Sequence, residues 1–532
     1  MVDTTPADTT PVGTEADDSA RPRPRRARAA RLALLVAAFV CAACGLVYEL
    51  SLVTLGSYLL GNTAAQASIT LSVMVCAMGV GALAAKPLRE HAAVAFVAVE
   101  LALAAIGGFS VLLLYAAYAW LDLYMAALIV VSIVIGILVG AEIPLLMELL
   151  QRIRRQEASG AVADLFAADY VGALLGGLAF PFVLLPIFGQ IRGSLIVGVV
   201  NALAGLTVVF VLFWRDVRPV TRWLCGVGSV LVCSLLVAGY VGADRFEATA
   251  QQQLYAYPIV LREQTRYQHI VITESVSLRK PPEVRLYLNG DLQFTSADEY
   301  RYHESLVHPV LSGSRRNVLI IGGGDGLALR EVLKYPDVER VTLVELDPEM
   351  IRLARTDPRL TRLNEHAFDD PRVNVVNADA FSWLRTSSGG FDAEIVDLPD
   401  PDETAVAKLY TKEFYSLAAH ALAPGGRMVV QSGSPYFAPR SFWCIEATIR
   451  AADLAVRPYH VNVPSFGDWG YVLAARGDEP ELRLDTPEPL RSLNRATLDA
   501  AAVFPPDRGP RDEKVSTLMH PVLVELEQQE WN

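Results

Sequence analysis

Asn317-Val-Leu-Ile-Ile-Gly-Gly-Gly-Asp-Gly326 is the stretch of sequence that decides the fold of this chain. The apolar run from Val318 to Ile321 predicts a buried strand that leads into a cluster of glycines, and residues 327–334 predict a helix directly after it. Glycine lets the backbone approach a ligand closely, and the first N–H groups of a helix are free to bind it. A strand, a glycine loop and a helix in this order predict a nucleotide-binding site.

Two carboxylates beside this loop indicate which nucleotide binds there. Glu345 closes the next expected strand, about 20 residues on, where a carboxylate can accept hydrogen bonds from ribose hydroxyls. Asp325 lies between the last glycines and would face the amino-acid tail of an S-adenosyl ligand. A carboxylate there would repel the carboxylate of S-adenosylmethionine and attract the ammonium group of its decarboxylated form. We therefore expect the decarboxylated ligand.

The composition divides the chain into two parts. Residues 32–242 are almost continuously apolar, whereas residues 243–532 are those of an acidic soluble domain. The net charge of −12 argues against nucleic-acid binding, since the basic residues form no stripe with interleaved aromatic residues. The six cysteines have no spacing typical of disulfides or zinc, and we expect no metal.

The apolar part predicts a membrane domain. Residues 1–31 predict a disordered tail that ends in a basic cluster, and residues 32–242 predict a transmembrane domain of about seven helices. The expected spans are 32–60, 67–85, 92–118, 122–149, 166–188, 193–214 and 222–242.

The charged loops predict the orientation of these spans. Alternate loops are basic, which places the N-terminus in the cytoplasm. Seven spans would then place the soluble part outside the cell, whereas the supply of nucleotide favours the cytoplasm, so the sequence leaves the side open. Glu49 and Glu142 lie deep in expected spans, where helix packing and a transport or lipid role are both open interpretations.

The soluble part alternates strands and helices. Residues 255–314 predict a small β-rich subdomain with strands at 268–273 and 284–288, a hairpin turn at Asn289-Gly290 and a helix at 298–311. Residues 315–480 predict a doubly wound, Rossmann-like α/β domain of methyltransferase type, and residues 481–532 predict a tail with a helix near 515–529. In the α/β domain the expected strands are 317–322, 340–346, 372–377, 391–397, 426–432 and 470–474, and the expected helices are 327–335, 348–355, 411–422 and 441–452.

Asp397 and Asp400 are the candidate residues for chemistry. They follow the strand at 391–397, and ligands bind at the carboxyl ends of such strands. One carboxylate can deprotonate an attacking nitrogen while the other holds cationic charge, so the pair suits an amine substrate. Asp-Pro is also a common turn, but two aspartates at the mouth of a nucleotide site favour function. Asp379-Ala380 can bind the adenine amino group, and a helix cap is the alternative role for this aspartate.

Seven motifs in this order resemble the polyamine aminopropyltransferases, the spermidine synthase family. They are Tyr267-Gln268, residues 289–309, Gly322-Gly-Gly-Asp-Gly326, Val344-Glu-Leu-Asp-Pro348, Asp379-Ala380, Asp397-x-x-Asp400-Pro401 and Leu409-Tyr-Thr-Lys-Glu-Phe-Tyr415. The resemblance covers about residues 255–480, and the apolar part is similar, with weaker motifs, to the membrane-embedded bacterial branch of that family.

The resemblance implies transfer of an aminopropyl group from decarboxylated S-adenosylmethionine to a diamine, from putrescine to spermidine, with release of 5′-methylthioadenosine. It implies that Asp397 accepts the proton. The residues that it assigns to the amine and the aminopropyl group are Asp400, Tyr302, His303, Asp325, Gln293 and Trp469, and those that it assigns to the donor are Gln268, Gly322, Gly324, Asp325, Glu345, Asp379 and Ala380. It also implies a homo-oligomer, a dimer or a tetramer.

Departures from the family pattern put the acceptor in doubt. Asn289 replaces the usual aspartate, Leu398-Pro399 replaces two hydroxyl residues, and Asp402-Glu403 adds acid that could suit a longer polyamine. Two other functions are kept as alternatives: a methyltransferase that uses intact S-adenosylmethionine, and a non-catalytic polyamine sensor or transporter.

Overall fold

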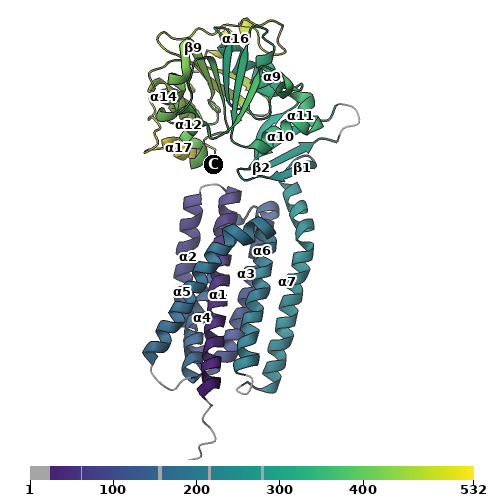
Figure 1. Ribbon diagram of the computed structural model, residues 1–532, viewed down its shortest axis with the longest axis vertical. Coiled ribbons are helices and arrows are strands. Elements are labelled where there is room, and N and C mark those ends of the chain that lie inside the picture. The colour runs from purple at the N-terminus through teal and green to yellow at the C-terminus, as the bar shows by residue number, and fades with distance from the viewer. Residues whose placement is uncertain (1–23, 61–62, 154–157, 214–216, 277–280, 532) are drawn as a thin grey trace, which may run out of the picture. The chain divides into compact units, whose positions relative to one another are not determined.

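The computed structural model describes residues 24–60, 63–153, 158–213, 217–276 and 281–531. The chain divides into two compact units, Met1–Leu254 and Tyr255–Asn532 (Figure 1). Most of the expected tail at 1–31 lies outside the described residues. Its basic end is helical, because the first helix begins at Pro24 rather than at residue 32.

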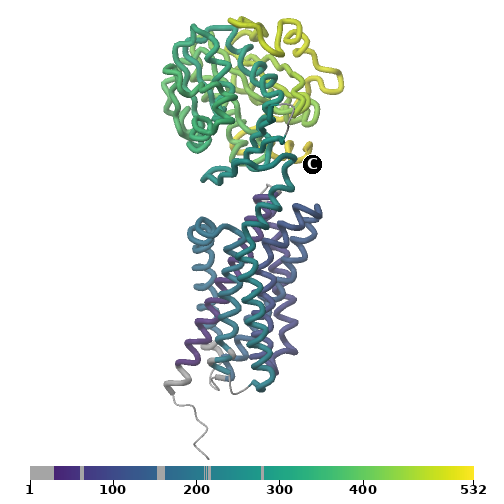
Figure 2. Tube along the Cα trace, turned by 90° about the vertical axis from the view of Figure 1, so that its right-hand side faces the viewer, coloured from purple at the N-terminus to yellow at the C-terminus, as the bar shows by residue number. Residues whose placement is uncertain are grey.

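The first unit is a bundle of long apolar helices (Figures 1 and 2). Its α-helices are α1 (Pro24–Leu60), α2 (Thr63–Ala84), α3 (Ala92–Ala116), α4 (Tyr124–Ile153), α5 (Ala158–Ala179), α6 (Leu185–Thr207) and α7 (Pro219–Gln253). Short 3-10 or π-helical turns lie between some of them: η2 (Lys86–His91), η3 (Ala117–Leu121), η4 (Phe180–Leu184) and η5 (Val208–Leu212). This unit is the multi-pass helical domain that the sequence predicts.

Six runs in the described residues are long and apolar enough to cross a membrane, where the sequence predicts about seven. The difference lies in the fifth run, Val162–Thr207, whose 46 residues would extend over roughly 70 Å as one helix, more than twice the apolar core of a bilayer. Gly189 interrupts this run, because its φ of 71° and ψ of −178° are not helical. Gly189 lies within the bounds of α6, so the run is not one straight helix but is broken at this residue into a part before it and a part after it.

Glycines bring these helices into backbone contact. A Cβ atom added to Gly140 of α4 would lie 2.1 Å from the carbonyl oxygen of Met78 on α2. One added to Gly172 of α5 would lie 2.2 Å from the carbonyl oxygen of Phe39 on α1. Small residues at such crossings are typical of membrane helices, since packing is what joins helices in lipid.

Ion pairs show which helix ends meet in this unit. Arg31 of α1 pairs with Asp164 of α5, so the N-terminal ends of these two helices lie at the same end of the bundle. Arg192 of α6 lies 2.6 Å from Asp244 of α7, so the start of α6 meets the last part of α7. Since α5 and α6 reverse direction at Gly189, α7 ends at the end of the bundle opposite to the start of α1.

The second unit begins with a small antiparallel sheet. Its strands lie in the order β1 (Ile259–Gln264), β2 (His269–Glu274), β3 (Val284–Leu288), β4 (Asp291–Thr295). The hairpin between β3 and β4 turns at Asn289 and Gly290, which have φ of 53° and 103°. Asparagine and glycine tolerate these positive values, so the turn forms where the sequence predicts it.

A seven-stranded mixed sheet forms the centre of the second unit, in the order β10-β11-β9-β8-β5-β6-β7. Its strands are β5 (Asn317–Gly322), β6 (Arg340–Glu345), β7 (Val373–Asn377), β8 (Phe391–Asp397), β9 (Leu422–Gln431), β10 (Ala455–Val463) and β11 (Gly467–Ala475). The pairings of β7, β6, β5, β8 and β9 are parallel, and β11 and β10 are antiparallel. This is the doubly wound, Rossmann-like arrangement that the sequence predicts.

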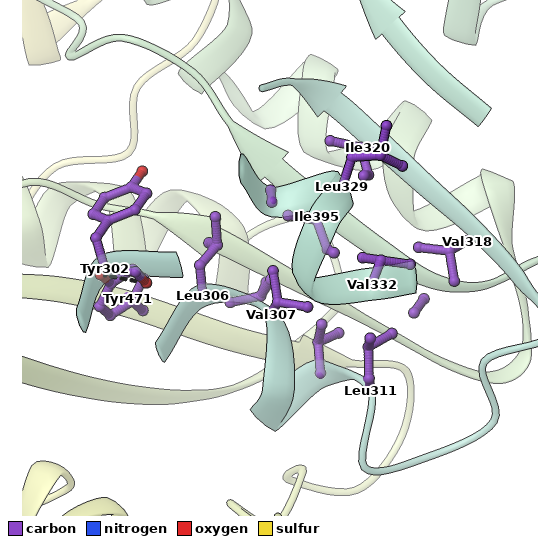
Figure 3. Packing of buried hydrophobic residues seen from close by; sticks show 14 of the residues in the cluster. Tyr302, Leu306, Val307, Leu311, Val318, Ile320, Leu329, Val332, Ile395 and Tyr471 are labelled. Carbon is purple, nitrogen blue, oxygen red and sulfur yellow. Dashed lines mark hydrogen bonds between the residues drawn. The ribbon is translucent and has the colours of Figure 1, made fainter. Parts of the chain in front are cut away.

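Helices pack against the large sheet. The helices of this unit are α8 (Glu299–Val310), α9 (Leu327–Leu333), α10 (Pro348–Thr356), α11 (Pro358–Leu363), α12 (Ala380–Leu384), α13 (Thr404–Ala407), α14 (Lys412–Ala421), α15 (Pro439–Arg450), α16 (Arg495–Ala501) and α17 (Val522–Glu530), with η6 (Ala367–Asp369) and η7 (Lys408–Tyr410). Leu306 and Val307 of α8 and Val332 of α9 belong to one buried cluster with Ile320 of β5 (Figure 3). The helix expected at 298–311 thus packs on the large sheet.

Several elements differ from the prediction. The strands β1, β4 and β10 and the helices α11, α12 and α16 are present where the sequence predicts none. The tail helix α17 begins at Val522 rather than near residue 515. Helix α7 continues to Gln253, past the expected end at residue 242. These elements are short or polar, and tertiary contacts determine them more than local periodicity does.

Glu394 of β8 is a buried acid whose replacement we expect to stabilise the fold. Its side chain is 0% exposed, and neither carboxylate oxygen has a hydrogen-bond partner in the described part of the chain. Burial raises the pKa of Glu394 well above 4.5, so the folded state becomes relatively less stable as pH rises above the pKa of the unfolded chain. Glu394→Leu should therefore raise the free energy of unfolding by about 1–3 kcal/mol at pH 8.

Denaturant unfolding at pH 8 and at pH 5 measures this effect, and the gain should be larger at pH 8. Asp392 of the same strand is the matched control, since its carboxylate accepts hydrogen bonds from Ser314 Oγ and Asn317 N at 2.9 Å each. Asp392→Leu should destabilise the protein. A loss of stability in Glu394→Leu would contradict the account.

Candidate functional site

The candidate site lies where β5 and β8 end side by side. Gly322 at the end of β5 pairs with Asp397 at the end of β8, and Gly323 N donates a 3.0 Å hydrogen bond to Asp397 O. Gly322 has a φ of 81°, and an added Cβ would lie 2.0 Å from the same carbonyl oxygen. Only glycine allows this turn, and the two loops meet at a switch point of the sheet, where ligands bind in such folds.

Glu345, at the end of β6, lies against the glycine loop. A Cβ added to Gly324 would lie 2.7 Å from Glu345 Oε2. Glu345 Oε1 accepts a 2.9 Å hydrogen bond from Asp347 N, which fixes the side chain toward the loop. Burial raises the pKa of Glu345 to about 7, and hydrogen bonds from ligand hydroxyls would favour the ionised form of this carboxyl.

Asp397 is a half-buried carboxylate with one phenolic partner. Tyr302 Oη donates a 2.7 Å hydrogen bond to Asp397 Oδ1. Burial raises the pKa of Asp397 to about 6, against a smaller lowering by His303, and Asp325 raises it further. A carboxylate with such a pKa is ionised at neutral pH and can still accept a proton from a reacting group.

His303 stands beside both aspartates. Burial alone would lower the pKa of His303, but the hydrogen bond and the charge of Glu299 raise it above 6.5, and Asp325 and Asp397 add to this effect. Asp325 lies two residues before α9, and its Oδ1 accepts a 2.8 Å hydrogen bond from Leu327 N, the first residue of that helix. The structure thus brings Asp325, His303, Tyr302 and Asp397 close to one another, and all four are residues that the resemblance assigns to the site.

A buried ion-pair network on α8 and α9 holds the His303 side chain in place. Glu299 Oε2 lies 3.1 Å from His303 Nδ1 and accepts a 2.9 Å hydrogen bond from Arg330 Nη2. Arg330 also bonds Glu331, whose Oε2 lies 2.9 Å from His308 Nε2. The network runs from α8 to α9, so it fixes the helix that carries Tyr302 and His303 relative to the helix that follows the glycine loop.

Asp400 lies in the loop after β8, which two side chains hold in place. Gln431 Nε2, at the end of β9, donates hydrogen bonds to Leu398 O at 2.6 Å and to Asp400 Oδ1 at 3.2 Å. Tyr410 Oη donates to Pro399 O at 3.0 Å. Burial raises the pKa of Asp400 to about 7. The loop is therefore ordered without the two hydroxyl side chains that Leu398 and Pro399 replace.

The residues that the resemblance assigns to the adenosine group have partners within the protein. Gln268 Nε2 donates a 3.0 Å hydrogen bond to Asp347 Oδ2, which places it beside the end of β6. Asp379 caps α12, accepting a 2.9 Å hydrogen bond from Ser382 N, and pairs with Lys408. Ala380 is buried at the first position of α12. The helix-cap role of Asp379 is thus present.

Trp469 and Gln293 have different surroundings. Trp469 is 7% exposed, and its ring lies 4.9 Å from that of Phe466, which in turn contacts Tyr302 at 6.2 Å. Within the described chain its indole Nε1 has no hydrogen-bond partner. Gln293 Nε2 donates to Asp291 O at 3.2 Å within β4. Trp469 therefore belongs to the aromatic side of the Tyr302 site, and no contact joins Gln293 to Asp397 in the described residues.

Several residues of this site have no role that the sequence predicts: Glu299, Arg330, Gln431 and Phe466. Glu299 and Arg330 are far apart in the chain and only the packing of α8 on α9 joins them. Gln431 ends a strand that carries no motif. Phe466 lies three residues before Trp469, and this closeness in the sequence is the one signal that could have found it.

The chain is similar to known proteins over nearly its whole length. Residues 299–486 match the spermine/spermidine synthase domain. The chain is 59% identical to polyamine aminopropyltransferase 1 of Streptomyces coelicolor, over 96% of each chain. It is 49% identical to the polyamine aminopropyltransferase of Mycobacterium tuberculosis, over 94% of this chain and 97% of that protein. Among solved structures, the spermidine synthase of Thermotoga maritima is 30% identical over 46% of this chain and 85% of that chain, with a TM-score of 0.41.

Proposed function

The chain belongs to the polyamine aminopropyltransferase family, and we propose that it transfers the aminopropyl group of decarboxylated S-adenosylmethionine to a diamine such as putrescine. The products are then spermidine and 5′-methylthioadenosine. The observation that carries this proposal is the position of Asp397, a half-buried carboxylate at the end of β8 that faces the glycine loop and accepts a hydrogen bond from Tyr302 at 2.7 Å. The six apolar runs fit an enzyme that is embedded in a membrane.

The donor would lie along the glycine loop. Glu345 would accept hydrogen bonds from its ribose hydroxyls, and Gly322 and Gly324 would let the backbone of the loop approach it closely. Asp325 would attract the ammonium group of the aminopropyl arm. A sulfonium sulfur is already a good leaving group, so the protein's main task is to align the two reactants and remove one proton.

The acceptor amine would lie between the two aspartates. Its unprotonated nitrogen attacks the aminopropyl carbon next to sulfur as the bond from that carbon to sulfur breaks, and the electron pair of that bond leaves with methylthioadenosine. The new ammonium gives its proton to Asp397, which Tyr302 and His303 hold in position. Asp400 would bind the distal ammonium group, with Trp469 as an apolar wall for the methylenes.

A panel of donors and acceptors tests this proposal. The purified full-length protein receives decarboxylated or intact S-adenosylmethionine with putrescine, cadaverine, spermidine or no amine, and mass spectrometry identifies the products. We expect methylthioadenosine and an aminopropylated amine from the decarboxylated donor only. A methylated product from the intact donor would instead establish a methyltransferase.

Asp325→Asn should weaken the choice between the two donors. The charge of Asp325 repels the carboxylate that only intact S-adenosylmethionine carries, and removal of this charge should lower the ratio of the two donor affinities by about ten-fold or more. Calorimetric titration with each donor measures the ratio. An unchanged ratio would show that Asp325 does not face the donor's tail.

The rate of transfer should rise with pH through about 6. Asp397 has a pKa of about 6 and must be ionised to accept the proton, so kcat/KM should fall below that pH. The hydrogen bond from Tyr302 lowers the pKa of Asp397, so Tyr302→Phe should move the acid limb of the profile to higher pH. A profile that is flat between pH 5 and 8 would contradict this role.

We propose further that residues 255–532 face away from the cytoplasm. The basic residues Arg31, Lys86, Arg89 and Arg152 belong to one end of the bundle, where Arg152 donates a 2.6 Å hydrogen bond to Arg89 O. The positive-inside rule places that end in the cytoplasm, and α7 leaves the bundle at the other end. Labelling of a cysteine introduced at Arg316, which is 75% exposed, by an impermeant maleimide in intact cells tests the side.

Self-association is the remaining expectation. A dimer or tetramer is implied by the resemblance to soluble relatives, and sedimentation of the detergent-solubilised protein measures it.

A further inference from the structure

Buried polar side chains from four helices meet inside the membrane unit. They are Tyr48 of α1, Glu100 of α3, Glu142 of α4 and Asn201 of α6. Tyr48, Glu100 and Asn201 are 0% exposed, and Glu142 is 4% exposed. These residues face neither lipid nor water, so their polar atoms depend on whatever lies inside the bundle.

Contacts at Glu100 show how closely these groups lie together. Asn201 Nδ2 donates a 3.3 Å hydrogen bond to Glu100 O, and a Cβ added to Gly205 would lie 2.6 Å from Glu100 Cβ. Glu142 and Tyr48 are both near enough to Glu100 to interact with it electrostatically. The two carboxylates thus share one low-dielectric region.

The unpaired atoms of this group are all able to accept hydrogen bonds. By hydrogen-bond geometry, the atoms without a partner among the residues that the structure describes are both carboxylate oxygens of Glu100, Glu142 Oε1, Asn201 Oδ1 and Tyr48 Oη. The Cys41 thiol and the Asn201 amide nevertheless lie close enough to the Glu100 carboxylate to interact with it. A buried carboxylate without a partner is costly, and a cation with several N–H donors would satisfy it best. An alkylammonium group has three such donors. The described residues contain no group of three or more His, Cys, Asp or Glu that could hold a metal ion.

A second set of buried polar atoms belongs to α2 and α4, and on α4 these residues lie nearer to the start of the helix than Glu142 does. Thr70 and Ser132 are each 1% exposed, and their hydroxyl oxygens have no partner within the described ranges. Gln66 Oε1 and Tyr124 Oη, equally unpaired there, both lie near Gly56, at 3.1 and 3.2 Å from an added Cβ.

These positions follow the axis of the bundle. Tyr124 begins α4 and Glu142 lies 142 − 124 = 18 residues further on, which corresponds to about 27 Å, most of the apolar core of a bilayer. Ser132 lies between them on the same helix. Hydroxyl and amide side chains can join membrane helices by hydrogen bonds, but these atoms have no such partner in the described residues. Ionisable residues inside a membrane bundle are typical of substrate and ion pathways.

We propose that the interior of the helical unit conducts a protonated alkylamine across the membrane, with Glu100 and Glu142 as its binding site. The two carboxylates bind one ammonium group of the amine. The hydroxyl and amide oxygens of the second set bind the ammonium groups as the amine moves along the bundle, and the apolar helices contact its methylene groups. This assigns transport to the membrane unit as a second function. This inference rests on the proposed function only for the identity of the amine, which is then a polyamine that the second unit uses or makes.

Release of amine from vesicles tests the proposal. The full chain is reconstituted in vesicles of phosphatidylethanolamine and phosphatidylglycerol loaded with radiolabelled putrescine or spermidine, without donor nucleotide. We expect release at least ten-fold faster than from protein-free vesicles, and Glu100→Gln and Glu142→Gln should reduce it to the protein-free rate. Glu148→Gln is the matched control, since Glu148 lies on the same helix and pairs with Arg152 at the bundle end; it should conduct as the wild type does.

Two further measurements separate the possible failures. Aminopropyl transfer in detergent should be unchanged in Glu142→Gln, which shows that the variant is folded, and Asp397→Asn should conduct amine normally although it is inactive as an enzyme. No release by the wild type, equal release by Glu142→Gln, or passage of protons without amine would each overturn the proposal. Amine release without any transferase activity would instead contradict the proposed function alone.

Discussion

Asp397→Asn is expected to lower kcat for aminopropyl transfer by about 10²- to 10⁴-fold, the range that general bases contribute. The amide keeps the size of the side chain and can still accept the 2.7 Å hydrogen bond from Tyr302, so the loop and the helix α8 should stay in place. What is lost is the ability to take the proton from the attacking amine. Donor binding should change little, because Asp397 holds no part of the adenosine group in this account.

Steady-state kinetics with the decarboxylated donor and titration of donor binding together test this prediction. Asp392→Asn is the control on the same strand, because Asp392 bonds Ser314 and Asn317 at the opposite end of β8. It should retain activity within a few-fold. An Asp397→Asn enzyme that is as active as the wild type would remove Asp397 from the mechanism.

Arg330→Met is expected to lower the free energy of unfolding of the second unit by about 3–5 kcal/mol, as the loss of one partner in a buried ion pair does. The Arg330 side chain is 9% exposed and pairs at 2.9 Å with both Glu299 and Glu331, which are 3% and 1% exposed. Its removal leaves two buried carboxylates with fewer partners. Because Glu299 also holds His303, the same substitution should lower transferase activity.

Arg316→Met provides the contrast for this measurement. Arg316 forms an ion pair with Glu339 at 3.5 Å, but the two side chains are 75% and 67% exposed. Exposed pairs contribute about 0–1 kcal/mol, so this variant should unfold at nearly the wild-type denaturant concentration. Equal effects of the two substitutions would mean that the network around Arg330 does not determine stability.

The sequence predicts the parts of this protein that depend on neighbouring residues. The strand and glycine loop at 317–326 and the Asn289-Gly290 hairpin form as local patterns dictate, because glycine and asparagine alone accept their backbone angles. The apolar helices are long enough to be recognised by composition. The convergence of Tyr302 and Asp397, 95 residues apart, follows only through the resemblance to a family.

Other features depend on contacts between distant segments. The Glu299–Arg330 network and the group formed by Glu100, Glu142 and Asn201 need two or more helices to pack, which no local pattern encodes. The backbone angles of the single residue Gly189 determine that residues 162–207 do not form one continuous helix. Glu394 interrupts an apolar strand. Nothing in the sequence indicates that its carboxylate has no hydrogen-bond partner in the described residues.

The most direct measurement is the fate of the donor's three-carbon chain. Decarboxylated S-adenosylmethionine labelled in that chain is incubated with the full-length protein and putrescine, and the amine products are analysed by mass spectrometry. The account predicts that the labelled chain appears intact on the amine, in a one-to-one ratio with methylthioadenosine, and that Asp397→Asn forms neither product. Label that stays on the nucleotide while the amine gains a methyl group, or gains nothing, would contradict it.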